Sequence, residues 1–313
     1  METTPIQPQI QSVYKLSKFG ILFKTSWNRY VTNLKLFLPI LLISGIVTIL
    51  TSLATPAPQP SGAPAAELGA GLRALFLFLF ILQIIIQSVS QIALREAALN
   101  QTVTLGLAFK KGLQFLVSYW WLTFIASAII LAGFFALIIP GIILSVSFSI
   151  MTFVLLNENI RSFAALQKSR AYVKGYGWSV FSLLFIFGIL TALMAIILTW
   201  IIKGVLGDFK ATSEIVSIIV LFTATPLITI ATAQIYQELK AIKEKQPTPK
   251  SLSVGTLKWL TVLGIIGVFA LAAAIPLFIA KISSNPRFQK YLSDPAIQEQ
   301  LNKTLNTLQN SAN

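Results

Sequence analysis

Residues 117–156 decide the fold: they read VSYWWLTFIASAIILAGFFALIIPGIILSVSFSIMTFVLL, forty residues without one charged side chain. A bilayer core about 30 Å thick is crossed by about 20 apolar helical residues, so this stretch is twice as long as one span requires. Pro140 and Gly141 lie near its middle, and this pair is typical of a tight chain reversal. We therefore predict two spans, residues 119–139 and 141–156, with a single kinked helix as the alternative.

Five further apolar runs, each about one span long, lie on either side of this stretch. They cover residues 36–54, 74–94, 179–202, 215–236 and 259–280. The composition agrees, because 55% of the 313 residues are hydrophobic and only 11% are charged, whereas soluble proteins contain about 25% charged residues. The sequence therefore predicts an all-α polytopic membrane protein with seven spans. The first run has the length of a full span, and we expect it to be retained and not cleaved as a signal peptide.

The distribution of charge predicts the orientation of the chain. There are 24 Lys and Arg against 10 Asp and Glu, a formal net charge of +14. Seventeen of the 24 basic residues lie in the N-terminal segment and in every second loop after it. The positive-inside rule places this side in the cytoplasm, and with it the N-terminus, so that the C-terminus is external. Anionic lipid headgroups are the expected partners of these cations, and no nucleic-acid partner is needed to explain them.

The chain divides into five predicted regions. A cytoplasmic N-terminus with an interfacial helix (residues 1–35) precedes a six-span membrane body of three helix-hairpin units (36–236). A cytoplasmic linker (237–258), a seventh span (259–280) and an external amphipathic tail (281–313) follow. The linker is assigned from its Pro-Thr-Pro stretch, because polar segments that contain proline favour extended spacers.

Three basic segments on the predicted cytoplasmic side resemble one another. Residues 23–27 read FKTSW, 109–113 read FKKGL and 166–170 read LQKSR, and each leads through aromatic residues into the next span. Basic and aromatic stretches of this kind are typical of helices that lie in the headgroup layer. We predict three interfacial helices, whose headgroup-binding cations are Lys24, Lys110, Lys111, Lys168 and Arg170. The alternative is the enrichment of Lys, Trp and Tyr that any multi-spanning protein shows at its interfaces.

A stripe of glutamines is the best candidate for a ligand-binding site inside the membrane. Gln83, Gln87 and Gln91 recur every four residues on one face of the span at 74–94. Hydrogen bonds between helices, worth ~0.6 kcal/mol each, are the first explanation of such residues. A polar cavity for a headgroup or small solute is the second. No charged residue lies in the central part of any predicted span, which argues against proton-coupled transport.

Residue types that most enzyme sites need are missing. The chain has no His and no Cys, which excludes the commonest general base, thiolate catalysis and zinc–thiolate sites. We predict no catalytic residue, no metal and no cofactor. Three acids, Glu96, Glu158 and Glu238, follow the even-numbered spans of the body. They are expected to pair with cations of the interfacial helices, namely Lys24, Lys110, Lys168 or Arg170.

The C-terminal tail carries a single apolar stripe. Asp294 and Pro295 suit the start of a helix, an N-cap followed by proline at the first helical position. One face of the otherwise polar helix after them carries Ile297, Leu301, Leu305 and Leu308. We predict that this stripe docks on an external protein partner, with the outer membrane surface and the protein's own external face as alternatives.

The region from Pro140 to Trp178 carries a resemblance to a bacterial family. Its motifs are PGI at 140–142, LLNE at 155–158, ALQKS at 165–169, Lys174-Gly175 and Trp178. They resemble the bacterial membrane domain that is sometimes fused to glycerophosphodiester phosphodiesterases, and its stand-alone multi-pass relatives. The segment from Thr25 to Pro39 is similar to their N-terminal pattern.

The resemblance implies a helical body in the bacterial cytoplasmic (inner) membrane. The catalytic phosphodiesterase domain is absent from this chain, so no phosphodiesterase activity is implied. Six spans are usual in the relatives, and this chain adds a seventh span and a tail.

These patterns together predict a non-enzymatic multi-pass membrane protein. Its role would be that of an accessory or scaffold subunit in envelope or lipid handling, which docks a partner through its external tail. The alternative is a carrier or channel for a lipid or small solute, with the glutamine stripe along its path. An enzyme that acts on membrane lipid through Glu96, Glu158 or Glu238 is the third hypothesis.

Overall fold

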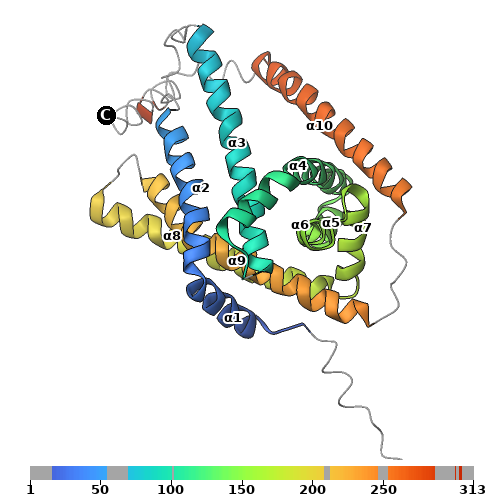
Figure 1. The fold of residues 1–313 in the computed structure, drawn as a ribbon. Helices are drawn as coiled ribbons and strands as arrows, with labels where there is room; N and C mark the ends of the chain where they lie inside the picture. The colour runs from blue at the N-terminus through green and yellow to red at the C-terminus, as the bar shows by residue number, and fades with distance from the viewer. Residues whose placement is uncertain are drawn as a thin grey trace, which may run out of the picture.

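The computed structural model describes residues 16–54, 70–100, 102–207, 212–245 and 253–285, together with three positions in the tail. Regular structure in these residues is α-helical throughout (Figure 1). The helices are α1 (Phe19–Thr32), α2 (Leu34–Ala54), α3 (Ala70–Leu99), α4 (Leu105–Ala136), α5 (Ile138–Phe148), α6 (Met151–Glu158), α7 (Ser162–Val173), α8 (Gly177–Leu206), α9 (Thr212–Glu244) and α10 (Val254–Ser283).

Six helical stretches among the described residues have the length and apolar composition of a membrane span. They are α3, α4, α8, α9 and α10, and α5 together with α6. The first predicted span is covered by α2, which has 21 residues and meets α1 at a bend of 85°. Six or seven such helices fit an all-helical polytopic membrane protein.

The uncharged stretch 117–156 forms a helical hairpin. α4 ends and α5 begins on either side of Leu137, which is extended (φ −171°, ψ 156°). The two helices pack closely, since a Cβ built on Gly133 would lie 3.0 Å from the Cα of Gly141. The chain therefore reverses at Leu137, three residues before Pro140. The proline falls in the first turn of α5, where its missing N–H has no helical partner to lose.

The three basic segments adopt two different structures. Residues 23–27 lie in α1 and residues 166–170 lie in α7, and both helices are separate from the spans that follow them. Residues 109–113 lie inside α4, which runs on without a break. The separate interfacial helix predicted there is therefore wrong, and Lys110 and Lys111 belong to the first turns of a long helix. No proline or positive φ angle interrupts α4 in this region.

Helices α1 to α9 form a ring of three units, α1–α3, α4–α6 and α7–α9, which we call the body from here on. In each unit, a small residue of the basic segment packs against a span of the unit before it. Ser26 of α1 accepts a hydrogen bond from Gln234 of α9 at 3.2 Å, which brings the first and last units together. A Cβ at Gly112 of α4 would lie 2.8 Å from a backbone oxygen of α3. Ser169 of α7 donates to a backbone oxygen of α5 at 2.7 Å.

The helix α10 lies outside this ring and packs along α4 (Figure 1). A Cβ at Gly264 would overlap the carbonyl oxygen of Ala128, and one at Gly267 would overlap the ring of Phe135. Small residues that allow two backbones to approach are typical of helix contacts in membranes. The opposite side of α10 is exposed, with Phe269 as an example at 72%.

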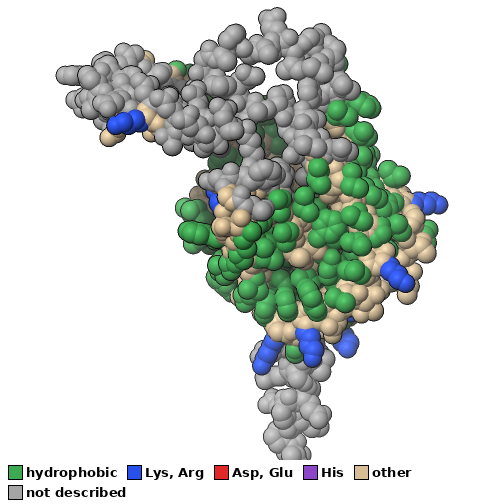
Figure 2. Space-filling view, turned by 90° about the vertical axis from the view of Figure 1, so that its left-hand side faces the viewer, with side chains coloured by type: hydrophobic (Ala, Val, Ile, Leu, Met, Phe, Trp, Pro, Cys, Tyr) green, Lys and Arg blue, Asp and Glu red, His purple; other side chains and the backbone are tan. Residues whose placement is uncertain are grey.

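The outer surface of the body is hydrophobic. Figure 2 shows apolar side chains over much of one face, with Lys and Arg at its margins. Large exposed apolar residues occur on α2, α3, α4, α8 and α10. Soluble proteins rarely expose contiguous apolar patches of more than a few hundred Å². Such a surface is suited to contact with lipid chains.

Candidate functional site at the basic end

Most described cations of the body gather where α3, α6 and α9 end and where α1, α4 and α7 begin. We call this region the basic end. Its cations include Lys24, Lys110, Lys111, Lys168, Arg170, Lys174 and Lys243. The three glutamates that follow the even-numbered spans lie here as well, and each makes its contacts with the beginning of the next unit. We refer to these three contacts as the first, second and third corners.

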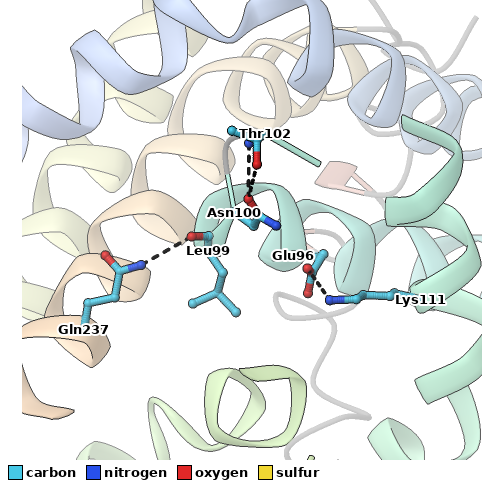
Figure 3. A network of polar contacts seen from close by, with 6 residues as sticks. All are labelled: Glu96, Leu99, Asn100, Thr102, Lys111 and Gln237. Atoms are coloured by element: carbon cyan, nitrogen blue, oxygen red, sulfur yellow. Dashed lines mark hydrogen bonds and ion pairs between the residues drawn. The ribbon is translucent and has the colours of Figure 1, made fainter. Parts of the chain in front are cut away.

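The first corner joins α3 to α4 (Figure 3). Glu96 accepts a 2.6 Å ion-pair hydrogen bond from Lys111, and the carboxylate side chain is only 3% exposed. The turn beyond it is held by Asn100, whose side-chain oxygen accepts from the N–H of Thr102 at 3.2 Å and from its hydroxyl at 2.8 Å. Gln237 of α9 donates to the carbonyl of the last α3 residue at 3.3 Å. Three helices are thereby fixed together.

The second corner joins α6, α7 and α9 through one carboxylate. Glu158 accepts from Lys168 at 2.6 Å, from the hydroxyl of Tyr172 at 2.9 Å and from the hydroxyl of Tyr236 at 2.8 Å. Asn157 donates to the hydroxyl oxygen of Tyr236 at 2.9 Å. The carboxylate therefore binds α7 by two charge-assisted hydrogen bonds and α9 by a third, and such bonds are stronger than those between neutral groups.

Burial and the neighbouring carboxylate also affect the acidity of the α7 tyrosine. Burial raises the pKa of Tyr172 well above its usual value, and its hydrogen bond to Glu158 raises the pKa further. Both effects favour the neutral phenol, because the phenolate would be poorly solvated and would face a carboxylate. Tyr172 is therefore a stable hydrogen-bond donor throughout the physiological pH range.

The third corner joins the end of α9 to the residues just before α1. Glu238 accepts from the backbone N–H of Ser17 at 2.9 Å and from its hydroxyl at 2.6 Å. Among the described residues no lysine takes part in this contact, and Lys24 lies exposed on α1. In α1 the position equivalent to Lys111 and Lys168, immediately before the small residue, is occupied by Thr25.

The predicted pairing of the three glutamates is thus confirmed at one corner. Glu158 pairs with Lys168 as predicted. Glu96 pairs with Lys111 and not with Lys110, because Lys110 is one position along the helix and points to solvent. The partner of Glu238 is Ser17, which the sequence reasoning did not consider.

A pocket of about 650 Å³ lies beside the second corner, between α5, α7 and α8. Its apolar wall comes from α5 and α8, and its polar wall comes from the end of α7, the turn after it and the first turn of α8. The lining residues that matter for its chemistry are Ile142, Ile143, Phe181, Arg170, Lys174 and Trp178.

The geometry of the turn between α7 and α8 positions the polar wall. Gly175 has a φ angle of +90°, a conformation that residues with a side chain rarely adopt, and it lets the chain turn from α7 into α8. The turn places Lys174 at the pocket and leaves Trp178 82% exposed. Lys243 of α9 lies nearby, with its ammonium group 5.3 Å from the ring centroid of Tyr176.

Arg170 is the most distinctive cation of the pocket. It is partly buried, and burial lowers the pKa of its guanidinium from the usual value; an arginine nevertheless stays charged at neutral pH. Among the described residues its side chain has no carboxylate or hydrogen-bonding partner. The glutamate predicted as one of its options, Glu158, is occupied by Lys168 and two tyrosines. A partly buried guanidinium without a counter-charge is a favourable site for an anion.

The glutamine stripe is separate from this pocket. Gln87 accepts a hydrogen bond from Ser44 of α2. The side-chain oxygen of Gln91 accepts from Arg95, one turn along the same helix, at 3.2 Å. Gln83 is partly buried. Two of the three amides therefore serve contacts within or between helices.

The predicted docking stripe of the tail, Ile297, Leu301, Leu305 and Leu308, lies outside the described residues. Two contributors to the basic end were also missed by the sequence reasoning, Ser17 and Tyr236. Tyr236 was assigned to the end of a span, where Tyr is common on general grounds, and no local pattern marks it as a partner of Glu158. In the part of the chain that the structure describes, no three acidic side chains come together as a metal site would need.

The chain was compared with protein-family models, with curated proteins and with solved structures, and no match was found in any of the three.

Proposed function

We propose that this chain is a non-enzymatic accessory or scaffold protein of lipid or envelope handling in a bacterial cytoplasmic membrane. Its basic end faces the cytoplasm and rests on anionic lipid headgroups. A protein partner docks on the external tail. This proposal combines the positive-inside distribution of charge with the arrangement of α7 in the structure.

The observation that carries the proposal is the way α7 is held. This helix has 12 residues, too few to cross a bilayer, and it lies between two helices of spanning length. Glu158 fixes it by two bonds, to Lys168 and Tyr172, and ties it to α9 through Tyr236. Arg170 and the exposed Trp178 remain at the surface of the pocket. A basic helix with aromatic neighbours, fixed beside a hydrophobic body, has the features of a segment in the headgroup layer.

The glutamine stripe gives less support to a carrier. Gln87 and Gln91 already have hydrogen-bonding partners in the structure, as residues that pack helices do. A solute path would require these amides to exchange such partners for the solute.

The orientation can be tested directly, because the chain contains no native cysteine. Single cysteines at Lys24 and Ser284, both exposed, give two probes for a membrane-impermeant thiol reagent. We expect the cysteine at 284 to react in intact spheroplasts, and the cysteine at 24 to react only after the membrane is permeabilised. The reverse pattern would reject a cytoplasmic basic end.

The role of anionic lipid can be tested with purified protein in nanodiscs. We expect a higher unfolding temperature in discs that contain phosphatidylglycerol than in discs of phosphatidylcholine alone, and a smaller difference at high salt because ions screen the headgroup charge. Equal unfolding temperatures in both lipids would contradict the proposal. Removal of residues 286–313 tests the docking half: co-purification of a partner with the full chain should be lost in the truncated one.

A further inference from the structure

We propose that the pocket between α5, α7 and α8 binds a single anionic glycerophospholipid, with its phosphate against Arg170 and Lys174 and its acyl chains along the apolar wall. The inference rests on the proposed function and deepens it, since it names one lipid class and one binding position. The general contact of the basic end with headgroups does not depend on it.

The cations of the pocket are suited to a phosphate. Arg170 offers a planar guanidinium that binds two phosphate oxygens at once, and it has no competing carboxylate among the described residues. Lys174 adds a second positive charge on the same wall. The first turn of α8 also lines the pocket, and backbone N–H groups at the start of a helix have no helical acceptor. Together these groups form a site for an anion.

The opposite wall is suited to a lipid and not to a free ion. Ile142 and Ile143 of α5 are 37% and 55% exposed, and Phe181 of α8 lines the same pocket. Trp178 packs edge-on against Phe181 with 5.8 Å between the ring centroids. Trp residues of this kind are enriched at headgroup depth. A free phosphate would leave this apolar wall in contact with water.

The size of the pocket also agrees with this ligand. Binding sites for small molecules usually enclose about 300–1,000 Å³, and this pocket has about 650 Å³. Such a volume holds a headgroup with its glycerol. The acyl chains then continue over the exposed side of α5 into the hydrophobic surface of the body.

In the described part of the chain, the other two corners lack this combination of groups. At the first corner the lysine next to the small residue, Lys111, is paired with a buried glutamate, and α4 continues beyond it without a break. At the third corner the glutamate is bound by Ser17. At the second corner Lys168 likewise satisfies the glutamate, but an arginine, Arg170, follows two positions later, where the first corner has Leu113.

The test is native mass spectrometry of detergent-purified protein titrated with phosphatidylglycerol and, separately, with phosphatidylcholine. We expect one phosphatidylglycerol per chain to be retained in preference to phosphatidylcholine. Arg170→Gln should weaken phosphatidylglycerol binding by about tenfold or more, because one charge-assisted bidentate contact is lost. Ile143→Trp should weaken it without a change of charge, by narrowing the apolar wall. Lys258→Gln, which removes an exposed cation outside the pocket, is the matched control and should bind as the wild type does.

The outcomes separate the pocket from the general lipid contact. Unchanged binding of phosphatidylglycerol by folded Arg170→Gln would overturn the pocket assignment. If stabilisation by anionic nanodiscs persisted in that case, the proposed function would still hold. Inorganic phosphate is the probe for a free ion: if it displaced the lipid at equal concentration, the lipid assignment would be overturned. Should Arg170→Gln not fold, Arg170→Lys keeps the charge without the bidentate geometry and is expected to bind more weakly than the wild type.

Discussion

The first and second corners begin from the same sequence pattern and end in different structures. In both, a lysine that precedes a small residue binds a glutamate at 2.6 Å. At the first corner the helix continues from the lysine into a long span, and at the second it stops at a turn through Gly175. The comparison teaches that the basic pattern fixes the contact between units. The break in the helix after it creates the pocket.

The two carboxylates also differ in how they are satisfied. Glu96 is 3% exposed, and the only partner that the structure shows for its side chain among the described residues is Lys111. Glu158 is 10% exposed and has two tyrosine hydroxyls besides its lysine. Loss of the lysine should therefore have a larger effect at the first corner than at the second.

The largest expected effect is that of Lys111→Met. This change leaves the buried carboxylate of Glu96 without a counter-charge, and a buried charged group that loses its partner costs more than the roughly 1–3 kcal/mol of a neutral one. The neighbouring Lys110→Met is the matched control, since Lys110 is exposed and an exposed change usually alters stability by less than about 0.5 kcal/mol. The free energy of unfolding in detergent micelles measures both. Equal destabilisation by the two variants would remove the distinction between the two lysines.

A smaller effect is expected for Lys168→Met. Glu158 keeps the two tyrosine hydroxyls, so the loss should be about 1.5–3 kcal/mol, the range for one hydrogen bond to a charged group. The same unfolding measurement applies. The double variant Lys168→Met with Tyr236→Phe should lose more unfolding free energy than the sum of the two single losses. In it Glu158 keeps only the hydroxyl of Tyr172 among the three donors described above. Strict additivity would show that the three bonds are independent.

The break after α7 can be tested with Gly175→Ala. A side chain in the left-handed region costs about 1–2 kcal/mol, and open space around Gly175 means that strain is the only expected penalty. Gly177→Ala is the control, because Gly177 has similar open space and lies in a helix without a positive φ angle. Stability should fall in the first variant and stay level or rise in the second. If Gly177→Ala were the less stable of the two variants, the left-handed residue that ends α7 would not be Gly175.

The smallest expected effect concerns pH. The pKa of Tyr172 is raised in the folded protein, so the contribution of its hydroxyl is fully present below the unfolded pKa of about 10 and is lost as the pH rises through the folded value. The stability difference between the wild type and Tyr172→Phe should therefore be constant from about pH 7 to 9. A difference that shrank within this range would contradict the raised pKa.

Much of the fold followed from periodicity and composition. Six of the seven predicted apolar runs correspond to helical stretches of spanning length in the structure. They could be recognised because the thickness of the bilayer sets the length of a span. The hairpin in residues 117–156 was expected from its length, but the reversal lies at Leu137, since proline suits the start of a helix better than the turn itself.

The site was harder to predict, because its members come from distant parts of the sequence. Lys168 and Glu158 are ten residues apart and were recognised, whereas Tyr236 reaches the same carboxylate from 78 residues away. Local patterns also failed to distinguish Lys110 from Lys111, since only the rotation of α4 against α3 decides which one faces Glu96. The pocket itself depends on the packing of α5 against α7 and α8, which no motif encodes.

The most direct test of an anionic lipid at the second corner is photo-crosslinking from Trp178 in living cells. A benzoylphenylalanine at this position, where the native side chain is 82% exposed, reports which molecules lie at the mouth of the pocket. We predict crosslinks that are enriched in anionic glycerophospholipid relative to its share of the membrane, and loss of that enrichment when Arg170 is changed to Gln. Crosslinks that simply follow the bulk lipid composition in both proteins would contradict the account.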